Sequence, residues 1–144
     1  MHHVAIMKKS WGLVSKILSG EKTIESRWYK NKSAPWGKIQ TGDTVWFKNS
    51  GEPVTVRAIV SKVLTFEGLT QGKVRTLLEE YGGQDGLTKP DIPHYFELFQ
   101  DKKYCLLIFL EKTEKVAPFA VAKKGFGAMA AWLTLQDIKT IKVQ

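Results

Sequence analysis

The sequence predicts an α+β fold, a small mixed and mainly antiparallel β-barrel with short peripheral helices. Segments rich in β-branched and aromatic residues recur along the chain, with tight glycine turns and short segments of helical periodicity between them. At 144 residues, the chain has room for one domain, residues 1–144, with a sizeable core. It contains no internal repeat or Ser/Gly linker that would mark a domain boundary.

The predicted strands are runs of Val, Ile, Thr, Trp and Phe, whose side chains suit a pleated surface. The clearest are residues 43–48 and 54–66, which are joined by a turn at 49–52. Residues 104–111 are so apolar that we expect both faces of that strand to be covered. The other predicted strands are residues 4–7, 23–28 and 119–121.

Helices are predicted where apolar residues recur at helical spacing. Ser10 is expected to cap the first helix, and Gly20 stands where a left-handed glycine ends one. The face between them would carry Trp11, Val14, Ile17 and Leu18. The remaining predictions are helices at 70–81 and 94–99, loops at 31–42 and 82–93, and a helix or turn at 128–135.

The charge of the chain is positive and uneven. There are 22 Lys and Arg residues against 14 Asp and Glu, which gives a net charge of +8. Residues 1–40 carry +6 of this excess. Such a local excess favours polyanions or phosphorylated small molecules as partners, and the alternative is a solvated basic face.

Several features favour a cytoplasmic location without a membrane partner. The single cysteine, Cys105, excludes an internal disulfide and a Cys-rich zinc module, and it suits a reducing compartment. The longest apolar run, residues 104–110, is far shorter than the ~20 residues that cross a bilayer. Residues 1–11 lack the pattern of a signal peptide.

The histidines predict neither a metal site nor a cofactor. None has acidic or cysteine residues at metal-ligand spacing. His2 and His3 are expected to fray with the N-terminus, and His94 stands at a helix start.

The densest run of functional groups is residues 20–27. In a strand, Glu25 and Arg27 share one face about 6.6 Å apart, so they can pair or reach one ligand. Lys22 has the opposite parity and joins them only if the chain bends after Gly20. The alternative is a surface ion pair beside a helix end.

This run resembles the G-x-K-x-x-E-x-R signature of the ASCH domain, at Gly20, Lys22, Glu25 and Arg27. That family is similar in fold to the PUA domains, which are small β-barrels that bind RNA. The resemblance implies a PUA-like barrel over residues 1–144. It also implies a module that binds RNA, a nucleotide or a nucleoside in a cleft lined by Lys22, Glu25 and Arg27.

The resemblance also leaves an enzyme open, because some members are small hydrolases. The substrate would be N4-acetylcytidine, or RNA for a ribonuclease, with Lys22 as a base and Glu25 as the second catalytic candidate. In the amidohydrolase pattern, a threonine three positions after the lysine is the nucleophile. Glu25 occupies that position here, and neither Thr23 nor Ser26 has the spacing.

The amidohydrolase pattern includes a distant acidic residue, for which Glu79 or Glu80 would be the candidate. A third class of function is a protein-binding adaptor, because the family's name originates in a transcription coactivator. That function predicts an exposed apolar patch away from the cleft.

Aromatic residues interleaved with lysines supply further ligand-binding candidates. Nucleic-acid bases stack on such rings for ~1–3 kcal/mol each. Trp28 and Trp36 are the best candidates, because polar or loop residues flank them. The alternative is that both belong to the core.

Two loops are the last ligand-binding candidates. Lys48, Asn49 and Ser50 enter a hairpin turn that, in ASCH-like barrels, borders the cleft. Lys123 and Lys124 precede the predicted final helix, whose N-terminal N–H groups would bind an anion. The alternative for this second loop is a flexible basic segment.

Overall fold

The computed structural model describes residues 1–127 and 129–143. One mixed sheet has the strand order β2-β5-β4-β3-β1-β6, and β7 adds to β5. All strand pairs are antiparallel except the parallel pair β1 and β3. The strands are β1 (His2–Met7), β2 (Ile24–Tyr29), β3 (Thr44–Asn49), β4 (Val54–Phe66), β5 (Tyr104–Val121), β6 (Trp132–Leu135) and β7 (Lys142–Val143).

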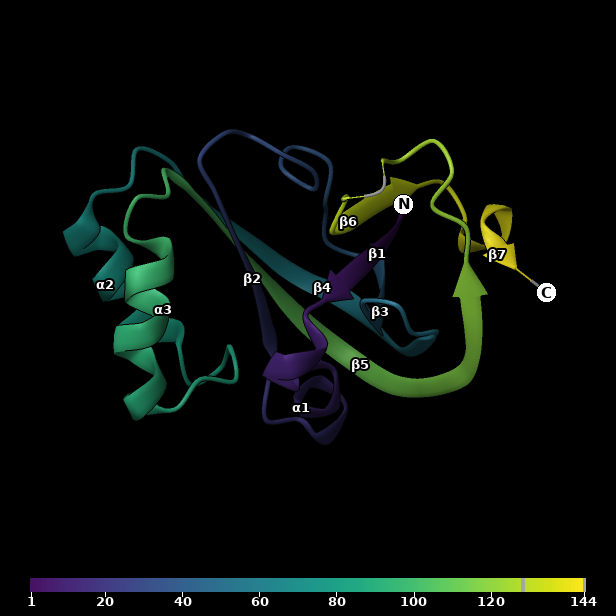
Figure 1. Cartoon of the computed structure of the whole chain (residues 1–144), viewed down its shortest axis with the longest axis horizontal. Coiled ribbons are helices and arrows are strands. Elements are labelled where there is room, and N and C mark those ends of the chain that lie inside the picture. The colour runs from purple at the N-terminus through teal and green to yellow at the C-terminus, as the bar shows by residue number, and fades with distance from the viewer. Residues whose placement is uncertain (128, 144) are drawn as a thin grey trace.

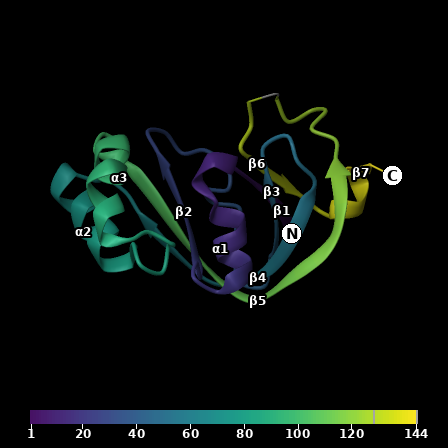
Figure 2. The same cartoon turned by 60° about the horizontal axis from the view of Figure 1, so that its bottom comes forward.

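The sheet curls into a half-barrel, with α1 against its concave side and α2 and α3 at one end (Figures 1 and 2). The predicted α+β class and mainly antiparallel barrel are therefore confirmed, although the barrel is half closed. The helices are α1 (Leu13–Ser19), α2 (Gln71–Tyr81) and α3 (Ile92–Phe99), with short 3-10 turns η1 (Lys9–Trp11), η2 (Lys89–Asp91) and η3 (Ile138–Thr140).

The long strand pair β4 and β5 forms the back of the half-barrel. Register shifts along this pair bend it, which lets the sheet curl. β5 runs through the charged residues after Glu111, so the separate strand predicted at 119–121 is the end of β5. The charged residues suggest that the strand ends near Glu111. Instead the strand continues, because Glu114 lies opposite Arg57 in β4 and pairs with it.

The first helix begins later than predicted. Ser10 lies in η1, and Gly12, with φ of 64°, is the residue that precedes α1. This shift leaves Leu18 42% exposed rather than on the buried face. Gly20 ends α1 in the left-handed conformation, as predicted.

Two predictions about the chain ends are wrong. Where a helix or turn was expected at 128–135, residues 132–135 form β6, which pairs with β1; residue 128 itself lies outside the described residues. His2 and His3 do not fray, because β1 lies between β3 and β6 inside the sheet. Leu133 and Leu135 alternate onto the cluster that includes Trp46, whereas Trp132 is buried on the interior face of the half-barrel.

The core has three parts that together position the site. One lies inside the half-barrel between the sheet and α1, and includes Val45 and Phe47. A second joins β2 and β5 to α2 and α3. The third covers the other face of β1, β3 and β6, and includes Trp46. Across the described residues, we find no helix with both the length and the apolar character that a membrane crossing requires.

Candidate functional site

A cleft of about 200 Å³ lies along β2, which is the last strand of the sheet and has a free edge. The end of β1 and the start of α1 form one side of the cleft, and α3 with the loop around Asp85 forms the other. Three of the four charged residues of the 20–27 run line it, namely Lys22, Glu25 and Arg27; Glu21 does not. The structure therefore brings these three residues together in one cleft.

Lys22 reaches the others because the chain bends after Gly20. Gly20 has a φ of 87°, which ends α1, and the Lys22 amide then donates to the Lys16 carbonyl at 3.0 Å. The amides of Thr23 and Ile24 donate to the Gln84 carbonyl at 2.8 and 3.0 Å. These bonds fix the segment against the loop that carries Asp85.

The Lys22 ammonium is fully engaged by protein groups. The residue is 2% exposed, and its Nζ donates to the Ile24 carbonyl at 2.8 Å, to the Asp85 carbonyl at 2.9 Å and to Asp85 Oδ1. It also pairs with Glu25 Oε1 at 3.2 Å. Burial alone would lower the pKa of Lys22, but the carboxylates of Asp85 and Glu25 outweigh it and raise the pKa. Lys22 is therefore a stable cation, which is unfavourable for a base.

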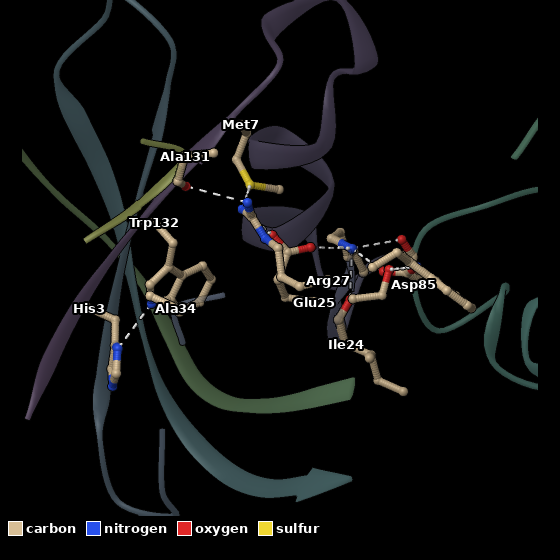
Figure 3. A network of polar contacts seen from close by, with 12 residues as sticks. His3, Met7, Ile24, Glu25, Arg27, Ala34, Asp85, Ala131 and Trp132 are labelled. Carbon is tan, nitrogen blue, oxygen red and sulfur yellow. Dashed lines mark hydrogen bonds and ion pairs between the residues drawn. The ribbon is translucent and has the colours of Figure 1, made fainter. Parts of the chain in front are cut away.

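Glu25 and Arg27 form a second ion pair deeper in the half-barrel. Glu25 is 3% exposed, so this pair is not a surface ion pair. Arg27 Nη2 donates to Glu25 Oε2 at 3.1 Å (Figure 3). Burial alone would raise the pKa of Glu25, but Lys22 and Arg27 lower it, so Glu25 is an ionised acceptor.

The Arg27 guanidinium bridges the open side of the half-barrel. It lies over the Trp132 ring, 5.0 Å from the centroid. It makes a long hydrogen bond to the Ala131 carbonyl at 3.4 Å and donates to Met7 Sδ, a weak acceptor, at 3.3 Å (Figure 3). Arg27 thus joins β2 to the start of β6 and to β1.

Asp85 is the cleft residue that sequence reasoning missed. Its Oδ2 accepts from Ser26 Oγ at 2.5 Å, and Ser26 Oγ in turn accepts from Trp28 Nε1 at 3.1 Å. Burial is the main cause of the raised pKa of Asp85, and Lys22 opposes this rise. The acidic candidates Glu79 and Glu80 are instead exposed on α2 and do not line this cleft.

Gly86 could have pointed to this loop. It has a φ of 86°, and a Cβ at this position would lie 3.2 Å from the Lys22 side chain. A side chain here would be strained and crowded at once. A glycine after an acidic residue in a glycine-rich segment is a weak signal, however, and it does not reveal a partner 63 positions away.

Aromatic rings form the other wall of the cleft. Trp28 is largely buried and stacks on Phe99, with centroids 5.0 Å apart and an angle of 7° between the planes. Trp11 meets the edge of Tyr95 across the same cleft. Trp28 is therefore both core and cleft wall. Trp36 does not line the cleft and packs against Tyr104.

The two predicted loop sites do not contribute to this cleft. Asn49 donates to Glu52, and Ser50 is exposed in the turn. Lys48 is buried on β3 outside the cleft. Lys123 and Lys124 precede turn residues and then β6, so the predicted anion site at the N-terminus of a final helix is wrong.

A buried histidine supports Arg27 from behind. His3 is 0% exposed; its Nε2 bonds to Asp43 Oδ2 at 2.8 Å, and its Nδ1 accepts from Trp132 Nε1 at 3.0 Å (Figure 3). An indole N–H only donates, so the His3 proton is on Nε2. Burial lowers the pKa of His3, which keeps the ring neutral near pH 7. The described residues contain no group of three His, Cys, Asp or Glu side chains able to hold a metal.

The chain is a curled mixed half-barrel with a buried Lys–Glu–Arg cluster in a cleft at the edge of the sheet. No family model matches the chain, and no curated protein matches it in sequence. Solved structures do match. The ASCH structure from Zymomonas mobilis is 17% identical, over 99% of this chain and 96% of that chain, with a TM-score of 0.67.

A mutant of that protein matches at 18% identity, over 96% of this chain and 93% of that chain, with a TM-score of 0.68. The N-terminal domain of McrB from Staphylothermus marinus is 14% identical, over 81% of this chain and 75% of that chain, with a TM-score of 0.52. The chain therefore has the ASCH fold.

Proposed function

We propose that this protein binds RNA or a nucleotide-like ligand, and that the cleft along β2 holds one base or nucleoside. The observation that carries the proposal is the pairing of an ionised Glu25 and Arg27 with an aromatic wall in one cleft. Bases are recognised by such polar groups at their edges and by stacking on their faces.

The size of the cleft supports a small ligand. Its volume of about 200 Å³ is below the roughly 300–1,000 Å³ of sites for drug-sized ligands. A single base fits this space better than an extended segment does. Glu25 Oε1 pairs with Lys22 and Oε2 pairs with Arg27. Both oxygens keep a lone pair that can accept a hydrogen bond from the exocyclic amine of a base.

The main chain of β2 adds donors and acceptors at the same place. The Thr23 carbonyl accepts from Leu110 on the β5 side, whereas Ile24 bonds to Gln84 on the other side. By the alternation of an antiparallel ladder, the N–H and C=O of Ser26 and Trp28 also face away from β5. A free strand edge beside the aromatic wall can therefore read the edge of a base.

Titration of labelled single-stranded RNA over a salt series tests this function. Wild-type protein should bind at low salt, and Arg27→Ala should weaken binding by about 10- to 100-fold, the effect of losing a good base contact. Arg75→Ala removes an exposed arginine of α2 that does not line the cleft, and it should bind like the wild type. Absence of binding at low salt, or binding unaffected by Arg27→Ala, would overturn the proposal.

A second candidate is a small hydrolase, and one observation favours it. Ser26 lines the cleft and donates a short hydrogen bond to Asp85, whose raised pKa, caused mainly by burial, suits a proton acceptor. Ser26 Oγ would attack the acetyl carbonyl of N4-acetylcytidine while Asp85 takes its proton. Asp85 would return that proton to N4 as the C–N bond breaks and cytidine leaves, and water would then hydrolyse the acetyl-serine to acetate. Lys22, engaged by four acceptors, would hold Asp85 in place rather than act as the base.

Incubation with N4-acetylcytidine, and separately with RNA, distinguishes this candidate from binding alone. Turnover should release cytidine or RNA fragments and should be lost in Ser26→Ala. Ser15→Ala, a change of an exposed serine on α1, serves as the control. Equal product from Ser26→Ala would point to a contaminating enzyme.

A further inference from the structure

The turn between β1 and α1 places a lysine and a tryptophan together in the cleft. Lys8 precedes η1, and its carbonyl accepts from the Trp11 amide at 3.1 Å. Side chains three positions apart eclipse each other in a 3-10 turn, and the Lys8 ammonium lies over the Trp11 ring, 5.5 Å from the centroid. Both residues line the cleft. Lys8 is exposed, so this turn forms the outer part of the cleft, whereas Lys22 and Glu25 form its buried part.

Among the described residues that line the cleft, Lys8 is the cation that no carboxylate holds. The Lys22 ammonium pairs with Asp85 and Glu25. The Arg27 guanidinium pairs with Glu25 as well. Within the part of the chain that the structure describes, the Lys8 ammonium makes neither a hydrogen bond nor an ion pair. Because an exposed contact between a cation and a ring is weak, this ammonium can leave the ring for an anionic group at little cost.

Trp11 offers a surface on which a base can stack. The residue is half-buried and packs on the interior cluster that includes Phe47. It meets Tyr95 of α3 edge to face, with the ring centroids 5.4 Å apart. The part of the ring beneath the Lys8 ammonium is covered by an exposed side chain rather than by the core. Stacking of a base on an aromatic ring is stronger than an exposed cation–ring contact, so a base can displace Lys8 from Trp11.

This turn adjoins the polar group that the proposed function assigns to a base. Met7 directly precedes Lys8, and its Sδ accepts from Arg27 Nη2 at 3.3 Å (Figure 3). On the opposite wall of the cleft, the Tyr95 ring lies 6.0 Å from that of Phe99. A nucleotide joined to one that is held at Arg27 can therefore reach the turn without leaving the cleft.

We propose that Lys8 and Trp11 form a second nucleotide subsite, in which Trp11 stacks the base next to the one in the cleft and Lys8 binds the phosphate between them. The cleft then takes two consecutive nucleotides of an RNA strand rather than one nucleoside. The proposal rests on the proposed function for the first base. A base that displaces Lys8 from the ring frees its ammonium for the phosphate, so the two contacts form together. Lysine suits this role as a mobile point charge.

The alternative is that the contacts of Trp11 only hold α3 against the turn. Competition with labelled single-stranded RNA by nucleosides and by dinucleoside monophosphates separates the two explanations. For wild-type protein, the dinucleoside monophosphates should compete better by about 10- to 100-fold, the worth of one stacked base. Trp11→Leu should remove most of this advantage and leave nucleoside competition the same. Trp11→Phe keeps a ring and should retain most of the advantage.

Trp36→Leu is the matched control, because Trp36 is also half-buried beneath a lysine but does not line the cleft. It should keep the wild-type advantage. An advantage unchanged in Trp11→Leu would overturn the subsite. A loss shared equally by nucleosides and dinucleoside monophosphates would overturn it as well, because Trp11 would then only shape the cleft.

The salt dependence of RNA binding tests Lys8 without a change in the core. Lys8→Gln loses one phosphate contact, so the slope of log affinity against log salt should fall by about 0.7 for a single strand. Lys32→Gln removes the same charge from the exposed lysine over Trp36, outside the cleft, and should leave the slope unchanged. Equal slopes for Lys8→Gln and Lys32→Gln would contradict the proposal.

The same competition separates failure of this subsite from failure of the base cleft. If nucleosides compete and a second nucleotide adds nothing, the base cleft stands and the subsite is wrong. If nucleosides do not compete, while dinucleoside monophosphates bind in a way that depends on Trp11 and not on Arg27, the subsite stands and the base cleft is wrong.

Discussion

The two cations of the 20–27 run differ in what surrounds them. Lys22 is 2% exposed, and carbonyl and carboxylate oxygens occupy its donors at 2.8–3.2 Å. Arg27 is half-buried and keeps one firm bond, to Glu25, beside two contacts of 3.3 and 3.4 Å. Charge-assisted bonds of ordinary strength are shorter than the 3.4 Å contact to the Ala131 carbonyl, and the thioether sulfur of Met7 accepts only weakly.

This difference assigns the two residues distinct roles in one cleft. Lys22 is the centre that holds Asp85 and Glu25 together, so the cleft depends on it for its shape. Arg27 has donors in weak contacts that a ligand can replace without leaving a buried charge unpaired. A run that reads as a uniform charged cluster therefore contains a structural cation, Lys22, and a cation, Arg27, that the proposed function assigns to ligand binding.

The largest expected effect is on stability, at Lys22. Lys22→Met leaves Asp85 and Glu25 buried without their shared cation, and it should lower the free energy of unfolding by about 3–5 kcal/mol. Lys9→Met breaks an exposed pair with Glu52 and should change stability far less, because solvent screens that pair. Urea denaturation of both variants measures the contrast. A loss at Lys22 no larger than that at Lys9 would contradict a structural role for Lys22.

The loop that presents Asp85 to Lys22 provides the next effect. Gly86→Ala places a Cβ at a φ of 86° and 3.2 Å from the Lys22 side chain, which should cost about 1–3 kcal/mol in the free energy of unfolding. Gly83→Ala is the matched control, because its Cβ would meet no atom within 4 Å and its φ is not positive. Thermal denaturation should place Gly83→Ala near the wild type and Gly86→Ala well below it.

Arg27 should show the opposite pattern. Arg27→Lys keeps the charge but loses the planar fork, so RNA affinity should fall by about tenfold, while the free energy of unfolding changes by less than in Lys22→Met. Fluorescence titration and denaturation of the same preparation measure both quantities. A stability loss equal to that of Lys22→Met would remove the distinction between the two cations.

Local sequence patterns predicted much of the β2 side of this site. The period of two placed Glu25 and Arg27 on one face, and Gly20 correctly indicated where α1 ends and the chain bends. Asp85 was not predictable in this way, because its contact with Lys22 joins residues 63 positions apart. Neither periodicity nor spacing in the sequence tells which loop packs against the edge of β2, as the loop around Asp85 does.

The residues behind Arg27, Trp132 and His3, escape prediction for a different reason. The position of His3 near the N-terminus predicts fraying, although β6 pairs with β1 and encloses it. Residues 132–135 are too few, with Thr134 as their one polar residue, for the alternation of a strand to be recognised in the sequence. Without β6 in the sheet, neither the Trp132 ring nor the histidine behind it is connected to Arg27.

The smallest expected effect is a pH dependence of stability that originates on the Arg27 side of the cleft. Burial lowers the pKa of His3 below its ordinary value of about 6.5, so the folded protein holds the ring neutral while the unfolded chain takes up a proton. The stability gained from the neutral ring is complete above about pH 6.5 and is lost as the pH falls towards the folded pKa. Protonated Nδ1 would face the Trp132 N–H, donor against donor.

Denaturation between pH 7.5 and about pH 5, a range chosen to span the histidine pKa, measures this loss. His3→Gln should reduce the dependence, because glutamine does not titrate, and the remainder belongs to His2, whose pKa burial also lowers. His94→Gln on the exposed face of α3 should keep the wild-type dependence. RNA affinity should fall over the same range, since Trp132 supports Arg27 and the acceptors around Lys22 do not include a histidine. If His3→Gln keeps the wild-type pH dependence of stability and RNA affinity, the titrating group is not His3. The proposed role of His3 in supporting Arg27 through Trp132 would then be wrong.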